Sequence, residues 1–146
     1  MAVSDEAYNR VFSRIWLERW DDDTMLTALY LLTSKHRSLE GIYHLPWEYV
    51  AGDRKWPMKR LERAVEVLLN DEFIEYDEDA QVVLIVNALK AQSPSTKNHM
   101  IGAVRKLRAL PPNGLMNRFL EQARCHAPAF AEFMAKEMPE VFAHAM

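Results

Sequence analysis

The sequence predicts a mainly α fold with a small β-hairpin, an α+β arrangement that ends in a helical C-terminal extension. Apolar residues recur at three- and four-residue spacing through most of the chain, which indicates amphipathic helices. Two short runs rich in β-formers flank a polar turn near the middle, which indicates a hairpin. With 146 residues, of which 49% are hydrophobic, the chain can bury one sizeable core but not a second large domain.

Composition restricts where and how the chain acts. The formal net charge of -3 argues against coating nucleic acid by bulk electrostatics, so any DNA contact must come from local charge. Cys125 is the only cysteine, which excludes an intramolecular disulfide and suits a reducing compartment. The chain shows neither the start of a signal peptide nor a run approaching the ~20 apolar residues of a membrane span, so a cytoplasmic location without membrane contact is expected.

The first predicted helix follows three aspartates. Residues 8–15 suit an extended lead-in, and Asp21, Asp22 and Asp23 then precede a helix through about Thr33. Three carboxylates suggest a metal site, but acids just before an apolar-periodic segment more often cap the free N–H groups of a helix. No further ligands follow at a useful spacing, so the cap is favoured and no metal is expected.

A short strand and two closely spaced helices are expected next. Residues 41–45 form a β-like run, and Pro46 can open a helix of barely more than one turn over 47–51, which Gly52 is expected to stop. A polar turn over 53–56 leads to Pro57, which opens the longest clear helix, to about Asn70.

The hairpin completes a recognisable order. β-formers fill 73–76 and 82–86, and the polar stretch 77–81 joins them. A helix-turn-helix followed by a hairpin is the order of a winged helix. The predicted organisation is therefore a winged-helix domain over 1–92, with the helix-turn-helix at about 46–70 and the wing at about 73–87.

The rest of the chain, 93–146, is predicted to be a helical extension. The Ser-Pro break at 92–96 is the best linker candidate, and helices are expected over 97–110, about 113–126 and 128 to the end. Their Met-, Phe- and Ala-rich composition fits packing on the core or on a second copy. A basic run, Lys97, Arg105, Lys106 and Arg108, could extend a path for DNA, although an exposed tail helix is the favoured interpretation.

The candidate DNA-binding residues surround the start of the long helix. Lys59, Arg60 and Arg63 are expected on its outer face, where basic side chains can contact phosphates or guanine edges in the major groove. Basic side chains opposite an apolar stripe are also typical of an ordinary solvated helix face, which the helix alone would favour. The helix-turn-helix context makes DNA binding about as well supported as that interpretation. The complete predicted set is Arg54, Lys55, Trp56, Lys59, Arg60 and Arg63.

The predicted wing is acidic, which opposes a DNA role for that element. Six acids would repel a phosphate backbone: Asp71, Glu72, Glu75, Asp77, Glu78 and Asp79. Either only the recognition helix approaches DNA, or the domain docks proteins instead.

Catalysis is the least favoured class. The five histidines are dispersed, and none forms a pair with metal-ligand spacing. Only four glycines are present, without a phosphate-binding loop, and no nucleophile motif surrounds Cys125. A non-enzymatic protein without a cofactor is therefore expected.

The stretch from Arg14 to about Gln122 resembles the N-terminal winged-helix domain of phage replication organisers and DnaD-like replication initiation proteins. The most distinctive pieces are "GIYHLP", "FIEYDEDAQVVLIVNALK" and the Ser-Pro before "KN". The resemblance implies a winged helix that helps assemble replication proteins at an origin and associates with itself through elements flanking the wing. The chain departs from that family in its acidic wing and in lacking the separate C-terminal domain of longer members, so helicase loading by this chain alone is not expected.

These observations lead to one expectation and two alternatives. The expected protein is of phage or prophage origin, binds double-stranded DNA, forms a homodimer through flanking helices and acts in replication initiation or its control. The first alternative is a winged-helix module for protein interaction and oligomerisation that does not bind DNA. The second is a transcriptional regulator, since a dimeric winged helix can read paired half-sites.

Overall fold

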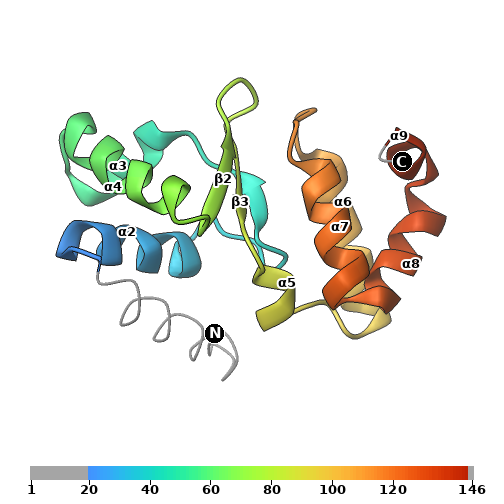
Figure 1. Ribbon diagram of the computed structural model, residues 1–146. Coiled ribbons are helices and arrows are strands. Elements are labelled where there is room, and N and C mark those ends of the chain that lie inside the picture. Colours follow the sequence, from blue (N-terminus) through green and yellow to red (C-terminus); the bar gives the residue numbers. More distant parts are fainter. Residues whose placement is uncertain (1–19, 145–146) are drawn as a thin grey trace.

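The computed structural model describes residues 20–144 and begins with a well-capped helix (Figure 1). Helix α2 spans Asp22–Thr33, and the side chain of Asp21 accepts a hydrogen bond of 2.8 Å from the backbone N–H of Thr24. The capping interpretation of the aspartates is therefore confirmed for Asp21. The extended lead-in predicted over 8–15 lies outside the described residues.

Strand β1 (Ile42–His44) leads into two consecutive helices, α3 (Trp47–Arg54) and α4 (Met58–Asn70). The predicted stop at Gly52 was wrong, because α3 runs through this glycine and is three residues longer than expected. The helix ends instead at Lys55, whose backbone is left-handed with φ 57°.

Strands β2 (Ile74–Asp77) and β3 (Val82–Ile85) form the predicted hairpin. Strand β1 adds to it, giving a three-stranded antiparallel sheet in the order β1-β3-β2. The predicted α+β class is confirmed, and the elements follow one another in the predicted order of helix, strand, two helices and hairpin.

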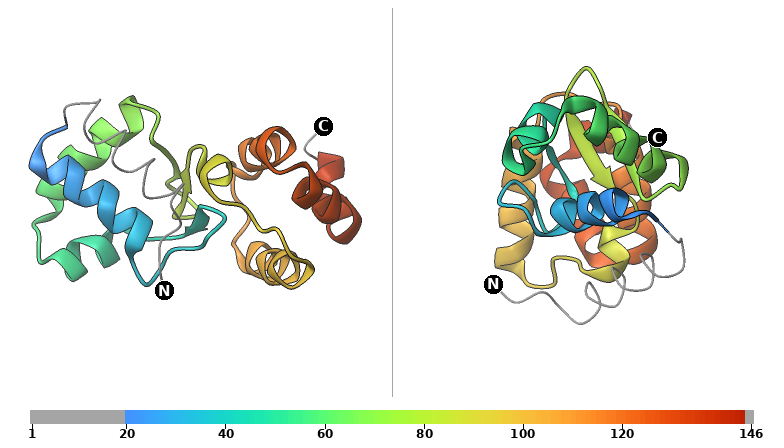
Figure 2. Two further views of the ribbon diagram at one scale, coloured as in Figure 1. Left: turned by 90° about the horizontal axis from the view of Figure 1, so that it is seen from below. Right: turned by 90° about the vertical axis from the view of Figure 1, so that its left-hand side faces the viewer.

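Helices cover both faces of the sheet. This explains why the sequence of the central strand, β3, is apolar throughout. Val83 and Ile85 pack with the core of α2, α3 and α4, whereas Val82 and Leu84 pack with the core of the C-terminal helices. Successive side chains of a strand point to opposite faces, so a strand covered on both sides needs no polar position. Figure 2 shows the sheet between the two groups of helices.

The C-terminal part differs from the prediction in two ways. A short helix that was not predicted precedes the linker, and the last predicted helix is divided in two. Met138 is not helical, and Pro139 opens a new helix after it. The observed helices are α5 (Ala88–Ala91), α6 (Lys97–Ala109), α7 (Met116–His126), α8 (Pro128–Glu137) and α9 (Pro139–His144).

The extension is joined to the sheet by polar as well as apolar contacts. The side chain of the buried Gln122 in α7 accepts a 3.0 Å hydrogen bond from the backbone N–H of Asn87, just before α5. Near the turn of the hairpin, the carboxylate of Asp77 accepts a 2.7 Å hydrogen bond from the N–H of Gly114. The helices of the extension therefore pack on the sheet of the same chain.

Candidate nucleic-acid interface

The turn between α3 and α4 determines where the basic side chains lie. The N–H of Trp56 donates to the carbonyl of Ala51, and the N–H of Lys55 donates to the carbonyl of Gly52. This pair of bonds around a left-handed residue is a Schellman ending, which closes a helix abruptly. Pro57 then precedes the first residue of α4, so the basic residues from 54 to 63 gather around one end of the helix pair.

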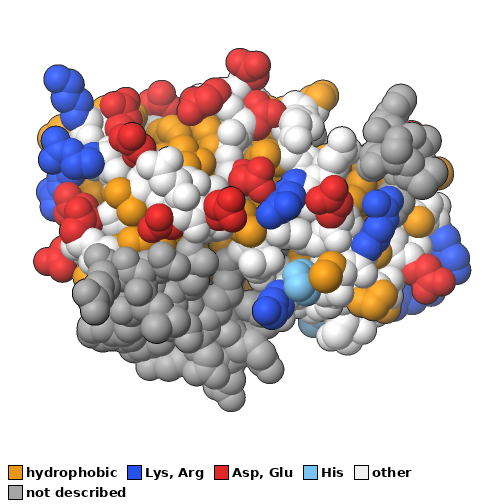
Figure 3. Space-filling model, viewed as in Figure 1, with side chains coloured by type: hydrophobic (Ala, Val, Ile, Leu, Met, Phe, Trp, Pro, Cys, Tyr) orange, Lys and Arg blue, Asp and Glu red, His pale blue; other side chains and the backbone are white. Residues whose placement is uncertain are grey.

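We define the basic edge as Lys55, Lys59 and Arg63. All three are exposed, and no ion pair joins any of them to another described residue. Figure 3 shows Lys and Arg side chains at the left edge of the molecule, where α3 and α4 meet in Figure 1. No acid lies in the first turn of α4, and the N-terminus of a helix is itself electropositive. This edge is the part of the predicted set that remains available to an anion.

Arg60 belongs to the predicted set, but it holds two helices together. Its guanidinium group donates two hydrogen bonds of 2.8 Å to the two carboxylate oxygens of Asp23 in α2. This contact lowers the pKa of the Asp23 carboxyl and raises the pKa of Arg60, so both groups stay charged together. Both side chains are partly exposed to solvent, at 48% for Arg60 and 33% for Asp23. Arg60 is therefore engaged within the protein before any ligand arrives.

Trp56 is also engaged by its neighbours. The guanidinium carbon of Arg60 lies 4.1 Å from the centre of its ring, and that of Arg54 lies 4.7 Å away. Such cation–π contacts orient all three side chains at the turn. Trp56 and Arg54 are half-buried, which makes them supports of the basic edge rather than free groups for stacking on bases.

Several acids at the end of α4 and in the hairpin have structural partners. The carboxylate of Asp71 accepts a 2.6 Å hydrogen bond from the indole N–H of Trp20, and Glu75 lies 3.1 Å from Arg118 of α7. Asp77 accepts hydrogen bonds from two backbone N–H groups, those of Ala80 and Gly114, which lower its pKa. These carboxylates tie the hairpin to its surroundings, while Glu78 at the turn stays exposed.

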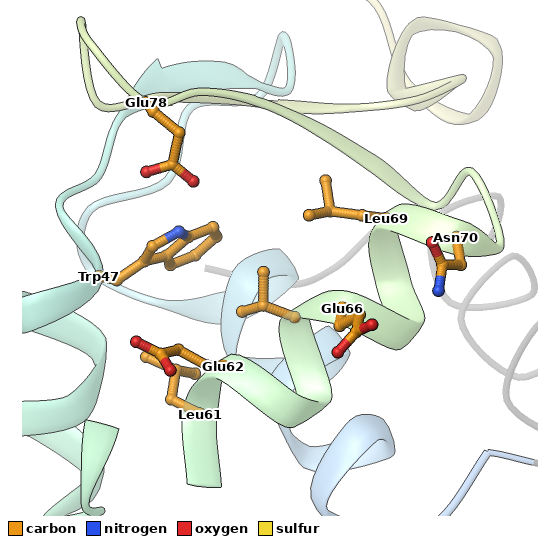
Figure 4. Close-up of a pocket in the computed structure, with 8 residues that line it drawn as sticks. Trp47, Leu61, Glu62, Glu66, Leu69, Asn70 and Glu78 are labelled. Carbon is orange, nitrogen blue, oxygen red and sulfur yellow. The ribbon is translucent and has the colours of Figure 1, made fainter. Parts of the chain in front are cut away.

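A cleft of about 310 Å³ lies between α4 and the hairpin turn, and we call it the acidic groove. Its apolar part includes Trp47, held in place by stacking on Tyr76 with ring centres 4.2 Å apart. Figure 4 shows Glu62 and Glu66 on the side of α4 and Glu78 opposite them on the hairpin. No basic residue lines it; the lining residues are Trp47, Leu61, Glu62, Val65, Glu66, Leu69, Asn70 and Glu78.

The acidic groove was missed at the sequence level, although a signal existed. Glu62 falls inside the predicted basic segment, which ends at Arg63, and Glu66 lies three residues beyond that end. These two glutamates are four residues apart on one helix and therefore face the same side. Consequently α4 carries Lys59 and Arg63 along one stripe and Glu62 and Glu66 along the neighbouring stripe, and only the first stripe suits a phosphate.

The second basic run lies on α6, in the other part of the molecule. Lys97, Arg105 and Lys106 are exposed, whereas Arg108 lies 3.7 Å from Glu140 of α9. These residues do not join the basic edge, because the sheet separates α6 from α3 and α4 (Figure 2).

Other functional groups are sparse in the described part of the chain. His36 lies 3.4 Å from Asp53, whose carboxylate also accepts a 2.6 Å hydrogen bond from the hydroxyl of Tyr30. Between residues 20 and 144, no three His, Cys, Asp or Glu side chains are grouped so that they could hold a metal ion. None of the helices between residues 20 and 144 has the length and apolar character that crossing a membrane requires.

Comparison with known proteins adds no relative. No family model matches the chain, and neither a curated protein nor a solved structure matches it.

Proposed function

We propose that this chain is a winged-helix protein that contacts the phosphates of double-stranded DNA through the basic edge. The observation that supports this most directly is the set of three exposed cations, Lys55, Lys59 and Arg63, which have no ion-pair partner among residues 20–144. Lys55 and Lys59 flank the electropositive start of α4, and phosphate is the anion that such an end favours; Arg63 follows one turn after Lys59. The resemblance of the sequence to replication organisers of phage or prophage origin supports a role for this contact in replication initiation or its control.

The mode of contact follows from the acids further along α4. Glu62 and Glu66 line the acidic groove, so a duplex lying along the whole helix would meet two carboxylates. DNA therefore approaches from the side of α4 that carries Lys59 and Arg63 rather than lying along the whole helix, and the contact is to the backbone rather than to base edges. Three phosphate contacts give weak binding that depends strongly on salt, with a slope of log K against log salt of about -3.

The experiment that tests this proposal reverses two charges of the basic edge. Lys59→Glu with Arg63→Glu should abolish binding to a fluorescent duplex in low salt, because repulsion replaces attraction at two of the three cations. The matched control is Lys90→Glu with Lys136→Glu, which alters the net charge equally at two exposed lysines of α5 and α8. The control should lose far less affinity. Equal loss in both variants, or unchanged binding in the first, would refute the assignment to the basic edge.

A second candidate function is a protein-interaction module that does not bind DNA. The acidic groove favours it, because an apolar surface beside Glu62, Glu66 and Glu78 suits a protein better than a phosphate backbone. Absence of any duplex binding by the unchanged protein in low salt would select this candidate. A transcriptional regulator remains the third interpretation, and sequence-specific binding that persists at high salt would select it.

A further inference from the structure

The acidic groove combines an apolar floor with carboxylates that form no ion pair with the described residues. Val65 and Leu61 are buried beneath it, while Leu69 is 37% exposed. Within residues 20–144, no Lys or Arg forms an ion pair with the glutamates of this groove. Such a surface is complementary to an apolar side chain flanked by cations.

A surface of that description exists on α6 of the same chain. Lys97, Ile101 and Arg105 are four residues apart, so they form one stripe along successive turns, which we call the α6 stripe. Ile101 is 41% exposed, more than the exposed leucines Leu26, Leu29 and Leu69. No ion pair to another described residue engages Lys97 or Arg105, although Glu137 of α8 shares a shallow cleft with Lys97 and Ile101.

The two surfaces of one chain cannot meet. The acidic groove lies between α4 and the hairpin, whereas α6 belongs to the group of helices on the other side of the sheet (Figure 2). The α6 stripe of a second copy has no such restriction.

We propose that the acidic groove binds the α6 stripe of a second copy of this chain, in a head-to-tail contact. Ile101 lies against the apolar floor beside Trp47 and Leu69. Lys97 and Arg105 are separated by about 12 Å at a rise of 1.5 Å per residue, so one cation reaches the glutamates of α4 and the other reaches Glu78. An apolar anchor of a helix placed in a groove between flanking ion pairs is a common mode of protein recognition.

The proposal predicts a particular kind of assembly. The two contacting surfaces differ, so each copy keeps one free groove and one free stripe, and the assembly can extend beyond a dimer. This differs from the homodimer through flanking helices expected from the sequence. A single helix in a cleft of about 310 Å³ forms a small interface, which implies weak, salt-sensitive association. The contact uses neither Lys59 nor Arg63 and is therefore independent of the proposed DNA binding.

The first measurement is sedimentation velocity of the full chain over a range of concentrations up to about 0.5 mM, a range that detects dissociation constants near the millimolar level. We expect the mean mass to rise steadily with concentration in low salt, without levelling off at the dimer, and to fall when salt is added. A chain that stays monomeric throughout would overturn the proposal and would leave the acidic groove to a basic partner of different sequence.

Two variants then separate the two sides of the contact. Glu66→Arg places a cation in the groove, and Ile101→Ser removes the apolar anchor of the stripe. Each variant alone should be monomeric. Their equimolar mixture should give a 1:1 dimer, because the intact stripe of Glu66→Arg fits the intact groove of Ile101→Ser. Nothing larger should form, because the other groove and the other stripe each carry a substitution.

The controls match these variants in chemistry and exposure. Glu132→Arg reverses an exposed acid of α8, and Leu26→Ser removes an apolar side chain of α2 that is 38% exposed. Both controls should assemble as the unchanged protein does. A symmetric dimer that survives Glu66→Arg or Ile101→Ser would overturn the proposal, and so would two monomeric variants that stay monomeric when mixed. Thermal unfolding of each variant identifies any loss of fold.

Discussion

Gly41 is the position at which one added methyl group best tests how the sheet is joined to α5. A Cβ placed on this residue would lie 2.3 Å from the Cβ of Ala88 and 3.5 Å from the Cβ of Ile85. The φ angle of Gly41 is +84°, in the region that L side chains rarely adopt. Its carbonyl accepts a 2.7 Å hydrogen bond from the N–H of Ile85, which limits how far the backbone can move.

We expect Gly41→Ala to lower the free energy of unfolding by about 2–5 kcal/mol. The left-handed backbone costs an alanine about 1–2 kcal/mol. The overlap with Ala88 adds about 1–3 kcal/mol, as overpacking of a core does. Gly52→Ala is the control, because a Cβ there meets nothing within 4 Å and Gly52 lies inside α3. It should raise stability by about 0.5–1 kcal/mol through helix propensity.

Urea unfolding followed by circular dichroism and tryptophan fluorescence measures these differences. A third variant separates the two costs: Ala88→Gly alone should destabilise by about 1 kcal/mol but should relieve the overlap in the Gly41→Ala background. The reasoning would be refuted if Gly41→Ala were as stable as the unchanged protein, or if Ala88→Gly recovered nothing from it.

Three further predictions concern other contacts of the fold. Replacing Lys55 by glycine relieves its left-handed backbone and should stabilise the protein by up to about 1 kcal/mol in urea unfolding, and a loss of stability would contradict the helix ending described. Gln122→Leu leaves the N–H of Asn87 without its acceptor and should cost about 1–3 kcal/mol in the same assay. The pKa of Asp77 is lowered in the folded protein, so its hydrogen bonds stabilise the fold above the unfolded pKa of about 3.9, and this stabilisation is lost as the pH falls through the lower folded value. Asp77→Asn should therefore weaken the pH dependence of the free energy of unfolding between about pH 5 and pH 2. The same pH dependence in the variant and the unchanged protein would contradict the role of the bond from Gly114 to Asp77.

The sequence predicted most of the fold because local signals agreed with the final packing. Pro57 and the apolar spacing from Leu61 to Leu68 placed α4 almost to the residue, and the three aspartates indicated the start of α2, although Asp22 and Asp23 lie inside the helix rather than before it. Gly52 misled because a glycine can stay within a helix when other residues form the actual end. Here the end depends on hydrogen bonds around Lys55, and lysine is not a residue from which a left-handed backbone is predicted.

The candidate site was harder to predict because charge alone does not show which side chains are free. Arg60 was grouped with Lys59 and Arg63 by position, but its engagement with Asp23 depends on how α2 packs on α4, which spacing along the chain does not determine. The acidic groove likewise needs the hairpin turn to fold back beside α4, so that Glu78 stands opposite Glu66. Tertiary packing therefore divided a single basic stretch into supporting residues and an exposed basic edge.

The salt dependence of duplex binding tests the central claim most directly. We predict that log K falls with log salt at a slope of about -3 for the unchanged protein, and that Lys59→Gln with Arg63→Gln reduces the slope to about -1, since each cation that meets a phosphate contributes about one. Unfolding curves of the two proteins should stay alike. An identical slope in both proteins, or no duplex binding by the unchanged protein in low salt, would contradict DNA contact through the basic edge.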